Sequence, residues 1–295
     1  MSGKGQEGAR ILLFGAGGQL GQALARLLGS RFLVQGLRHA DCDLADSAAV
    51  RAAIATAKPA IVINAAAYTA VDRAEDEPQR AHDANAVAPG VMAGEARRIG
   101  AVFVHYSTDY VFDGTGRVPY REDDPTAPLG VYGASKREGE ERVAAAGGSF
   151  YILRTAWLYG RHGRNFLTTM ERLGRERAQA GTPLTVVADQ HGSPTSVDAL
   201  AAATQGILDH AGVKDLGGLY HAVCRGETTW YGFAQAIIDG LRIGVEVKPI
   251  TTADYPTRAR RPGYSVLSGE RLQTAFGIRM PTWQEALAGC LQTAG

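Results

Sequence analysis

Two residues at helical spacing, Tyr132 and Lys136, carry the most suggestive chemistry in the sequence. Four residues apart at the start of a helix, their side chains project from the same face. A ketone that receives a hydride needs a proton on the developing alkoxide, and a tyrosine hydroxyl supplies it when a nearby ammonium lowers its pKa. The same spacing also arises by chance as a surface pair. Carbonyl reduction is therefore indicated only if other parts of a reductase accompany the pair.

A threonine lies where such a part is needed. Thr108 and Asp109 follow an apolar run at 102–105 that is typical of a buried strand. Ligands of doubly wound folds bind at the carboxyl edge of the sheet, where a strand-terminal hydroxyl can polarise a substrate carbonyl. A threonine at this point is also an ordinary cap. Taken together, Thr108, Tyr132 and Lys136 are the candidate catalytic trio, with Asp109 beside the substrate.

A glycine-rich loop follows the first apolar run and leads into a helix. Gly15, Gly18 and Gly21 have the spacing G-x-x-G-x-x-G, whereas the G-x-G-x-x-G alternative fails because Leu20 occupies its final glycine position. Such glycines permit a tight turn, backbone approach to a pyrophosphate and close helix packing, and the helix N-terminus favours an anion. A plain turn between strand and helix is the competing interpretation. The strand-loop-helix setting favours a dinucleotide site that includes Gln19 and Leu20.

The residue after the second strand indicates which dinucleotide binds. NAD-specific domains carry an acidic residue there that binds the ribose hydroxyls. Here the position holds Arg38, whose guanidinium can form charge-assisted hydrogen bonds with a 2′-phosphate. A solvated surface arginine is the alternative. We therefore expect NADPH as the cofactor, with use of NADH left open.

Alternating apolar runs and helix-like stretches must position these residues. Buried strands are expected at 11–14, 32–34, 61–63, 102–105 and 151–153, with helices at 22–28, 47–57, 81–99 and 135–146 between them. This order predicts a doubly wound, Rossmann-like α/β fold with a parallel sheet. After 155 the pattern loosens into strands at 184–187 and 219–223 and helices at 166–177 and 233–241.

The loosened pattern suggests a second, smaller domain. We expect residues 1–155 to form the dinucleotide-binding domain, to which 184–224 return. Residues 156–183 and 225–295 form a C-terminal substrate-binding domain, with a basic loop at 256–264.

Composition excludes several classes of protein. The chain of 295 residues has 45% hydrophobic residues and a net charge of +1, without the basic field that binds nucleic acid or an anionic membrane. The polar start and the lack of a long apolar run predict neither a signal peptide nor a membrane span. Cys42, Cys224 and Cys290 lie too far apart for a C-x-x-C pair. A soluble cytoplasmic protein with buried thiols is the expectation.

Together these segments resemble the dTDP-4-dehydrorhamnose reductase family, an extended branch of the short-chain dehydrogenases/reductases, over nearly the whole chain. The segments that carry the resemblance are 15–21, 64–72, 107–112, 132–136, 154–157, 165–166 and 189–195, with Arg261, Pro262, Ser265 and Leu267. One departure is Arg38, which replaces an acidic residue common in the family.

The resemblance implies a reaction and a set of contacts. Hydride passes from the nicotinamide to C4 of dTDP-4-dehydro-6-deoxy-L-mannose and gives dTDP-L-rhamnose, with Thr108, Tyr132 and Lys136 as catalytic trio and Lys136 also at the nicotinamide ribose. Asp43 and Leu44 fall near the adenine, Ala65, Ala66 and Ala67 near the cofactor, and Tyr68, Thr69, Val71, Trp157, Asn165 and Arg261 in the substrate pocket. For Arg261 a physical reason also exists, because a guanidinium can grip a diphosphate. Trp157 suits core packing equally well.

The resemblance also raises further expectations and alternatives. Some family members are Mg²⁺-dependent homodimers that use C-terminal acidic residues, and Asp198 and Glu285 lie in comparable regions. Surface acids are the simpler interpretation of both. A nucleotide-sugar 4,6-dehydratase would need an Asp-Glu pair after Thr108, where Asp109 and Tyr110 stand. A 4-epimerase and a non-catalytic regulatory subunit like that of methionine adenosyltransferase are the remaining alternatives.

Overall fold

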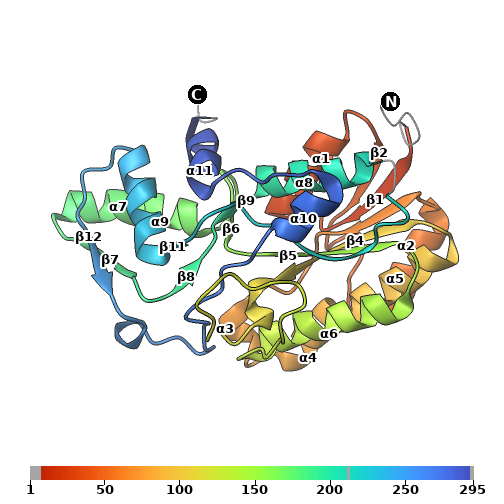
Figure 1. Ribbon diagram of the computed structural model, residues 1–295, viewed down its shortest axis with the longest axis horizontal. Coiled ribbons are helices and arrows are strands. Elements are labelled where there is room, and N and C mark those ends of the chain that lie inside the picture. The colour runs from red at the N-terminus through yellow and green to blue at the C-terminus, as the bar shows by residue number, and fades with distance from the viewer. Residues whose placement is uncertain (1–7, 211–212, 293–295) are drawn as a thin grey trace.

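Residues 8–210 and 213–292 are described by a computed structural model, and within them a six-stranded parallel sheet forms the centre of the larger part of the molecule (Figure 1). Its strands, in sheet order, are β10 (Gly218–His221), β5 (Phe150–Thr155), β4 (Val102–Thr108), β3 (Ile61–Asn64), β1 (Arg10–Phe14) and β2 (Leu33–Leu37), and each pairs in parallel with its neighbour. The inner strands β3 and β4 are buried throughout, as their continuous apolar runs require. The predicted doubly wound α/β fold is confirmed.

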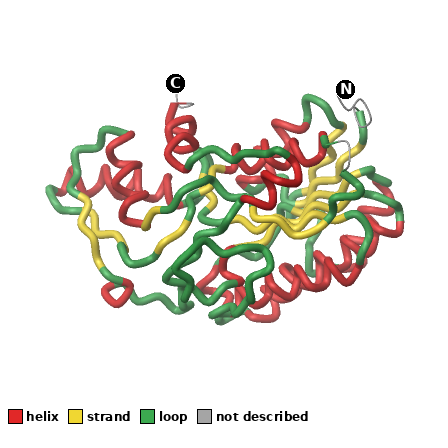
Figure 2. Tube along the Cα trace, viewed as in Figure 1, coloured by secondary structure: helices red, strands yellow, loops and turns green. Residues whose placement is uncertain are grey.

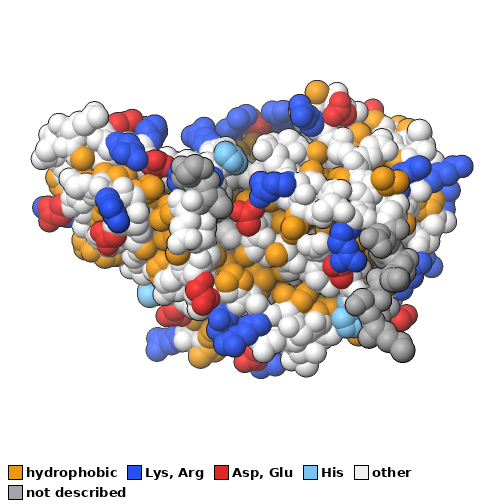
Figure 3. Space-filling model, turned by 90° about the horizontal axis from the view of Figure 1, so that it is seen from above, with side chains coloured by type: hydrophobic (Ala, Val, Ile, Leu, Met, Phe, Trp, Pro, Cys, Tyr) orange, Lys and Arg blue, Asp and Glu red, His pale blue; other side chains and the backbone are white. Residues whose placement is uncertain are grey.

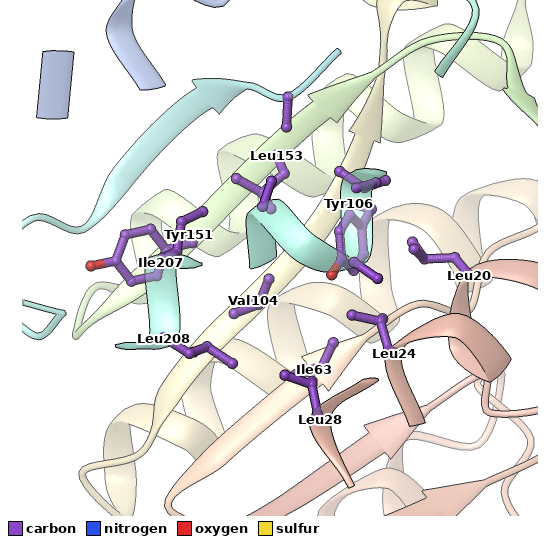
Figure 4. Close-up of a cluster of buried hydrophobic side chains, with 14 of the residues drawn as sticks. Leu20, Leu24, Leu28, Ile63, Val104, Tyr106, Tyr151, Leu153, Ile207 and Leu208 are labelled. Atoms are coloured by element: carbon purple, nitrogen blue, oxygen red, sulfur yellow. The ribbon is translucent and has the colours of Figure 1, made fainter. Parts of the chain in front are cut away.

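Helices cover both faces of this sheet, as Figures 1 and 2 show. One face carries α1 (Gln19–Leu28), α8 (Val197–Asp209) and α10 (Glu270–Phe276), and the other carries α2 (Ser47–Ala57), α5 (Ala88–Arg98) and α6 (Val131–Ala146). Figure 4 shows the first of the two cores, in which labelled side chains from α1, α8 and the inner strands meet: Leu20, Leu24, Leu28, Ile63, Val104, Tyr106, Tyr151, Leu153, Ile207 and Leu208. The chain order reverses between β1 and β3, which opens a crevice at the carboxyl ends of these strands.

The helix expected at 81–99 is interrupted in the structure. α3 (Val71–Ala74) and α4 (Pro78–His82) precede a π-helical turn, η1 (Asp83–Val87), which leads into α5. The helix α6 passes very close to this π-helical turn: a Cβ added to Gly139 of α6 would lie only 2.1 Å from the carbonyl oxygen of Asn85. The π-turn directs the Asn85 side chain inward, where it bonds the backbone of Tyr68 and the hydroxyl of Ser135. Helical periodicity alone does not reveal such a turn.

The C-terminal part forms its own core beside the large sheet. It contains α7 (Phe166–Ala180), α9 (Trp230–Gly240) and α11 (Trp283–Gln292), with paired short strands. These pairs are β6 (Leu158–Tyr159) with β9 (Thr195–Ser196), β7 (Leu184–Val187) with β12 (Val247–Ile250), and β8 (His191–Gly192) with β11 (Thr228–Thr229). Single turns of 3₁₀-helix are η2 (Asp109–Val111) and η3 (Thr252–Asp254). Within 184–224, β10 is the edge strand of the large sheet and α8 packs on that sheet. β7 instead pairs with β12, because its alternately exposed residues do not suit a sheet covered on both faces.

The surface shows mixed charge. In Figure 3 basic side chains are spread over the visible face with acidic ones among them. Across the part of the chain that the structure describes, no helix is long and apolar enough to cross a membrane. Cys42, Cys224 and Cys290 are all buried.

Candidate active site

A cleft of about 1200 Å³ runs along the carboxyl edge of the sheet, lined by residues that follow β1, β2, β3, β4 and β5. Most residues predicted for the site line it: Gly15, Gly18, Gln19, Leu20, Arg38, Asp43, Leu44, Ala65, Ala66, Ala67, Tyr68, Thr69, Thr108, Asp109, Tyr132, Lys136, Trp157 and Asn165. Predicted residues that do not line it are Gly21, Val71 and Arg261. The structure thus joins the glycine loop and the proposed trio in one cleft.

The glycine loop has two kinds of glycine. Gly15 has a φ of +81°, and a Cβ there would lie 2.6 Å from the backbone nitrogen of Ala66, while a Cβ on Gly21 would lie 2.0 Å from Gly15 O. These two are fixed by packing within the protein. Among the described residues, the nearest atom to a Cβ on Gly18 would be Gly15 O at 3.4 Å, so Gly18 is not required by internal packing. Gly18 is also the N-cap of α1, with no side chain capping it, which leaves the first N–H groups of the helix for a diphosphate.

The adenosine end of the cleft is formed after β2. Arg38 is exposed, and its side chain lies 3.6 Å from a Cβ built on Gly17, next to the loop that would hold the diphosphate. Its backbone N–H donates to the Asp41 carboxylate at 2.8 Å, which fixes the turn. Asp43 and the buried Leu44 complete this wall. The residues present therefore fit a dinucleotide with a 2′-phosphate.

Thr108 and Tyr132 meet because α6 packs tightly on the turn after β4. A Cβ on Gly133 would lie 2.2 Å from Tyr110 O, so glycine permits this contact. The rings of Tyr110 and Tyr132 meet edge to face, 5.8 Å apart. Thr108 Oγ1 donates to Asp109 at 3.1 Å and accepts from the Tyr110 N–H at 3.2 Å. Thr108 also hydrogen-bonds the Tyr132 hydroxyl.

Lys136 lies one turn further along α6 and is only 2% exposed. Its Nζ donates to Tyr106 O at 2.5 Å and lies 3.3 Å from His105 Nε2. Burial lowers the pKa of Lys136 to about 8, against an opposing effect from Glu140. The ammonium is therefore held within the sheet edge, beneath the cleft.

The tyrosine is protonated at neutral pH. Burial raises the pKa of Tyr132, and the negative charge of Asp109 adds to the rise, while the hydrogen bond with Thr108 opposes it. Lys136 is not among the groups that act on the Tyr132 pKa. From the sequence, Lys136 is expected to lower the Tyr132 pKa. The structure differs because the ammonium is directed to the Tyr106 carbonyl.

Asp109 is the most unusual acid of the site. It is 2% exposed, and its Oδ2 has no hydrogen-bond partner among the described residues. Burial raises its pKa to about 6, although hydrogen bonds from Ser265 and Thr108 oppose the shift. Its charge therefore changes close to neutral pH, directly beside the proposed catalytic hydroxyls.

Asn165 lines the cleft, but its polar atoms are engaged within the protein. Its Oδ1 accepts from the Thr168 N–H and caps α7, while Nδ2 donates to Gln19 at 2.7 Å and to Gly160 O at 2.8 Å. Asn165 thus ties the C-terminal part to the glycine loop. It has the contacts of a positioning residue.

Trp157 has a strained backbone and two covered faces. Its φ of 48° lies in the left-handed region, which costs a non-glycine residue about 1–3 kcal/mol. One face stacks on Trp230 with ring centroids 3.4 Å apart, and the other meets Gly192, where an added Cβ would lie 2.4 Å from the ring. Only a ring edge is left to the cleft, so stacking of a base on Trp157 has no room.

Arg261 and Val71 do not line the cleft, but both lie next to Tyr110. Arg261 pairs with Asp72 at 2.7 Å and donates to the Tyr110 hydroxyl at 3.2 Å. Val71 lines a small gap between Tyr110 and Tyr132. The basic loop therefore docks on α3 through Arg261, and the contact of this arginine with a diphosphate stays a prediction.

Several cleft residues had not been predicted. The buried hydroxyls of Ser107 and Thr155 line the cleft without a hydrogen-bond partner among the described residues, and Thr155 pairs with Thr108 across β4 and β5. Thr155 could have been found, since it follows a predicted strand just as Thr108 does. Arg80 and Arg164 also line the cleft. They come from distant segments without a shared motif.

The candidate metal ligands are engaged elsewhere. Asp198 pairs with Arg26, and Glu285 accepts hydrogen bonds from the backbone N–H and hydroxyl of Thr282. Over residues 8–210 and 213–292, no group of three or more His, Cys, Asp or Glu side chains is placed to hold a metal ion. These contacts give the expected Mg²⁺ no support.

Comparison with known proteins places the chain among reductases. A family model described as the RmlD substrate binding domain matches residues 9–295. The chain is 43% identical to a dTDP-4-dehydrorhamnose reductase of Burkholderia thailandensis, over 96% of this chain and 98% of that protein. It is 44% identical to a probable dTDP-4,6-dihydroxy-2-methyloxan-3-one 4-ketoreductase of Streptomyces antibioticus, over 94% and 93%.

A solved structure agrees with these relatives. The dTDP-4-dehydrorhamnose reductase of Bacillus anthracis in complex with NADP superposes with a TM-score of 0.92 at 36% identity, over 97% of this chain and 100% of that chain. The extent of these matches confirms the resemblance drawn from the motifs. The chain belongs to the dTDP-4-dehydrorhamnose reductase family.

Proposed function

We propose that this protein reduces the C4 keto group of dTDP-4-dehydro-6-deoxy-L-mannose with NADPH and releases dTDP-L-rhamnose. The observation that carries the proposal is the position of Thr108, Tyr132 and Lys136 in the cleft that begins at the glycine loop. The names of several relatives support the same reaction.

The cofactor role follows from the shape and charge of the cleft. NADPH, when bound, supplies the hydride. Its diphosphate would lie on the backbone of the glycine loop at Gly18, and its 2′-phosphate at Arg38, with Asp43 and Leu44 toward the adenine and Ala65 to Ala67 along the ribose side. The Bacillus anthracis relative, solved with NADP, supports this choice.

Tyr132 is the proton donor in this proposal. Because burial keeps its hydroxyl protonated at neutral pH, the proton is present when the keto oxygen gains charge. With the substrate in place, Thr108 would turn its one hydroxyl hydrogen from Asp109 to that oxygen and so stabilise the developing negative charge. A positioned acid of this kind contributes roughly 10²- to 10⁴-fold to the rate.

The substrate assignments divide into direct and indirect roles. Tyr68, Thr69, Asp109 and the edge of Trp157 line the cleft and are proposed to contact the nucleotide sugar. Asn165 acts indirectly, through its bond to the glycine loop. We propose that Arg261 holds Tyr110 in place through its hydroxyl, and that Val71 packs beside Tyr110 and Tyr132.

The wider organisation is proposed on the same basis. Residues 1–155 with α8 and β10 would bind the cofactor, and the C-terminal part around α7, α9 and α11 would complete the sugar pocket. A cytoplasmic location and a homodimer stay predictions.

The decisive experiment is a spectrophotometric assay of NADPH oxidation over a panel of dTDP-linked keto sugars. The panel includes the keto sugar named for the Streptomyces relative, the second candidate substrate. We expect fastest turnover with dTDP-4-dehydro-6-deoxy-L-mannose and at least a 100-fold loss in Tyr132→Phe. The control is Tyr151→Phe, which removes a buried hydroxyl bonded to Val213 O, away from the cleft. Unchanged turnover in Tyr132→Phe would rule out the proposed donor.

The same preparation separates the alternative functions. An epimerase recycles its cofactor, so stoichiometric NAD recovered with the purified protein and no net NADPH consumption would favour that class. A protein that oxidises no NADPH with any sugar of the panel would instead suit the regulatory role. The dehydratase is disfavoured by Tyr110, which stands where that reaction needs a glutamate.

A further inference from the structure

A buried line of hydrogen bonds connects the cleft wall at β3 to the catalytic lysine. Asn64 and His105 are opposite each other in the register of β3 and β4, and both are at most 1% exposed. Asn64 Nδ2 lies 3.2 Å from His105 Nδ1, and His105 Nε2 lies 3.3 Å from Lys136 Nζ. At the other end, the Asn64 side-chain oxygen accepts from the backbone N–H of Ala66 at 3.1 Å. The line thus runs from a cofactor-side residue to Lys136.

The line has a direction, which is set at Ala66. A backbone N–H can only donate, so it holds the oxygen of the Asn64 amide and turns the amide nitrogen toward His105. Since an amide nitrogen also only donates, Nδ1 of the imidazole accepts. Burial, aided by the charge of Lys136, lowers the pKa of His105 well below its usual value, so the ring is neutral and carries one hydrogen. That hydrogen is on Nε2, facing Lys136.

An N–H directed at Lys136 distinguishes its two charge states. An ammonium has three donors and no acceptor, whereas the amine form has a lone pair that accepts from His105 Nε2. In either charge state the lysine nitrogen donates a hydrogen bond to Tyr106 O. The arrangement therefore favours the amine relative to the ammonium, which makes the ammonium the stronger acid.

Other charges around Lys136 do not cancel this effect. Along α6, Glu140 favours the ammonium, but this carboxylate is committed to a bidentate pair with Arg154 of β5. From η2, Asp109 acts on Tyr132. From η1, packed on the other side of α6, the inward side chain is the neutral Asn85. Burial thus outweighs Glu140 at the lysine, and the His105 N–H faces it from 3.3 Å.

We propose that Asn64 and His105 are positioning residues for Lys136, which orient an N–H toward its nitrogen and so make the lysine a readier proton donor during turnover. The role rests on the proposed reduction. After Tyr132 gives its hydroxyl proton to the keto oxygen, one ammonium proton of Lys136 restores the tyrosine hydroxyl by way of a water in the cleft that both residues line. The amine left behind accepts from His105 Nε2 until water returns a proton. One hydride and one proton from water then account for both hydrogens added to the sugar.

The tautomer of His105 is the first test, and it is measured in the native protein, with a variant used only to assign the signals. Nitrogen NMR of the ¹⁵N-histidine-labelled protein distinguishes a ring protonated on Nε2 from one protonated on Nδ1. Seven histidines are present, and the His105 signals are those lost in His105→Gln. We expect the Nε2-protonated form throughout neutral pH. A ring protonated on Nδ1 would overturn the proposal.

The second test titrates the lysine directly. The chain has five lysines, Lys4, Lys58, Lys136, Lys214 and Lys248, so ε-¹³C-lysine labelling gives few signals, and the signal of Lys136 is the one lost in Lys136→Met. In Asn64→Asp, the carboxylate can accept from both Ala66 N–H and His105 Nδ1–H, which reverses the ring and lets Nε2 accept from the ammonium. We expect the lysine pKa to rise by more than one unit, a tenfold loss of acid strength. The exposed Lys58 and Lys248 should not move.

A double-mutant cycle separates transmission through the ring from simple attraction by the new charge. In a His105→Phe background, Asn64→Asp should shift the lysine pKa by less than half as much as in the native background. An equal shift in both backgrounds would overturn the proposal. His105→Leu, which also lacks hydrogen-bonding atoms, replaces His105→Phe if the latter does not fold, with retained circular dichroism as the check.

The kinetic consequence is a change in the pH profile. Because the ammonium is the acid, kcat falls as the pH rises through the lysine pKa, and Asn64→Asp should move this basic limb upward while lowering the plateau. A merely structural defect lowers the plateau without moving the limb. The NMR results stand without cofactor or sugar, so a failed reduction with the expected tautomer and titration would reject the proposed function and leave the hydrogen-bond line intact.

Discussion

Replacing Asp109 by asparagine should stabilise the folded protein at neutral and alkaline pH. The carboxyl is 2% exposed, with Oδ2 unpartnered among the described residues, and burial raises its pKa from 3.8 to about 6. An amide of the same shape keeps an acceptor for the Thr108 hydroxyl without a buried charge. The substitution therefore removes the free-energy cost of burying a carboxylate charge next to the proposed catalytic hydroxyls.

The size and sign of this effect follow from linkage. The pKa of Asp109 is higher in the folded protein than in the unfolded chain. The contribution of Asp109 to stability is therefore greatest below pH 3.8, where the carboxyl is protonated in both states, and it is lost as the pH rises through about 6. A shift of about two units at 1.36 kcal/mol each corresponds to roughly 3 kcal/mol. Asp109→Asn should thus gain up to about 3 kcal/mol near pH 8 and almost nothing near pH 4.

Urea unfolding at the two pH values measures the difference directly. The matched control is Asp113→Asn, at a carboxylate whose pKa is lowered by hydrogen bonds from the backbone and side chain of Thr115. This control should lose stability near pH 8, the opposite sign. An Asp109→Asn protein that is no more stable than the native one near pH 8, or that gains equally at both pH values, would refute the reasoning.

Three further substitutions test other parts of the structure. Arg38→Asp should raise the KM for NADPH at least tenfold more than that for NADH in steady-state assays, and equal changes would remove Arg38 as the 2′-phosphate ligand. Gly192→Ala places a methyl 2.4 Å from the Trp157 ring and should lower stability by about 1–3 kcal/mol in thermal unfolding, whereas an unchanged Tm would mean that the stack yields freely. Glu140→Gln leaves the guanidinium of Arg154, in a side chain 4% exposed, without its charge partner and should cost about 3–5 kcal/mol in urea unfolding; a loss below 1 kcal/mol would contradict that estimate.

Much of the fold could be predicted from the sequence, because buried parallel strands have continuous apolar runs. The strands around 11–14, 61–63 and 102–105 are present, and the chemistry at their ends follows from the direction of parallel strands. The π-turn at Asp83–Val87 could not be predicted, since it accompanies the close packing of α6 at Gly139, a contact between distant parts of the chain. A periodic pattern of apolar residues indicates which face of a helix is buried, but it does not indicate which other helix packs against that face.

The candidate site was predictable in its membership more than in its contacts. Residue type and motif position found the cleft residues, including Thr108 and Tyr132. They could not show that the Asn165 amide donates a hydrogen bond to Gln19, or that Arg261 pairs with Asp72. Such internal partners lie more than a hundred residues away in the chain, and no local pattern marks them.

Hydride delivery to C4 of the sugar is the central claim, and isotope transfer measures it most directly. NADPH carrying deuterium on the transferred position of the nicotinamide is mixed with the purified protein and dTDP-4-dehydro-6-deoxy-L-mannose, and the product is examined by NMR. The proposed function predicts one deuterium at C4 of dTDP-L-rhamnose, with the yield per unit time falling at least 100-fold in Tyr132→Phe. Deuterium at another carbon, or a product free of deuterium, would contradict it.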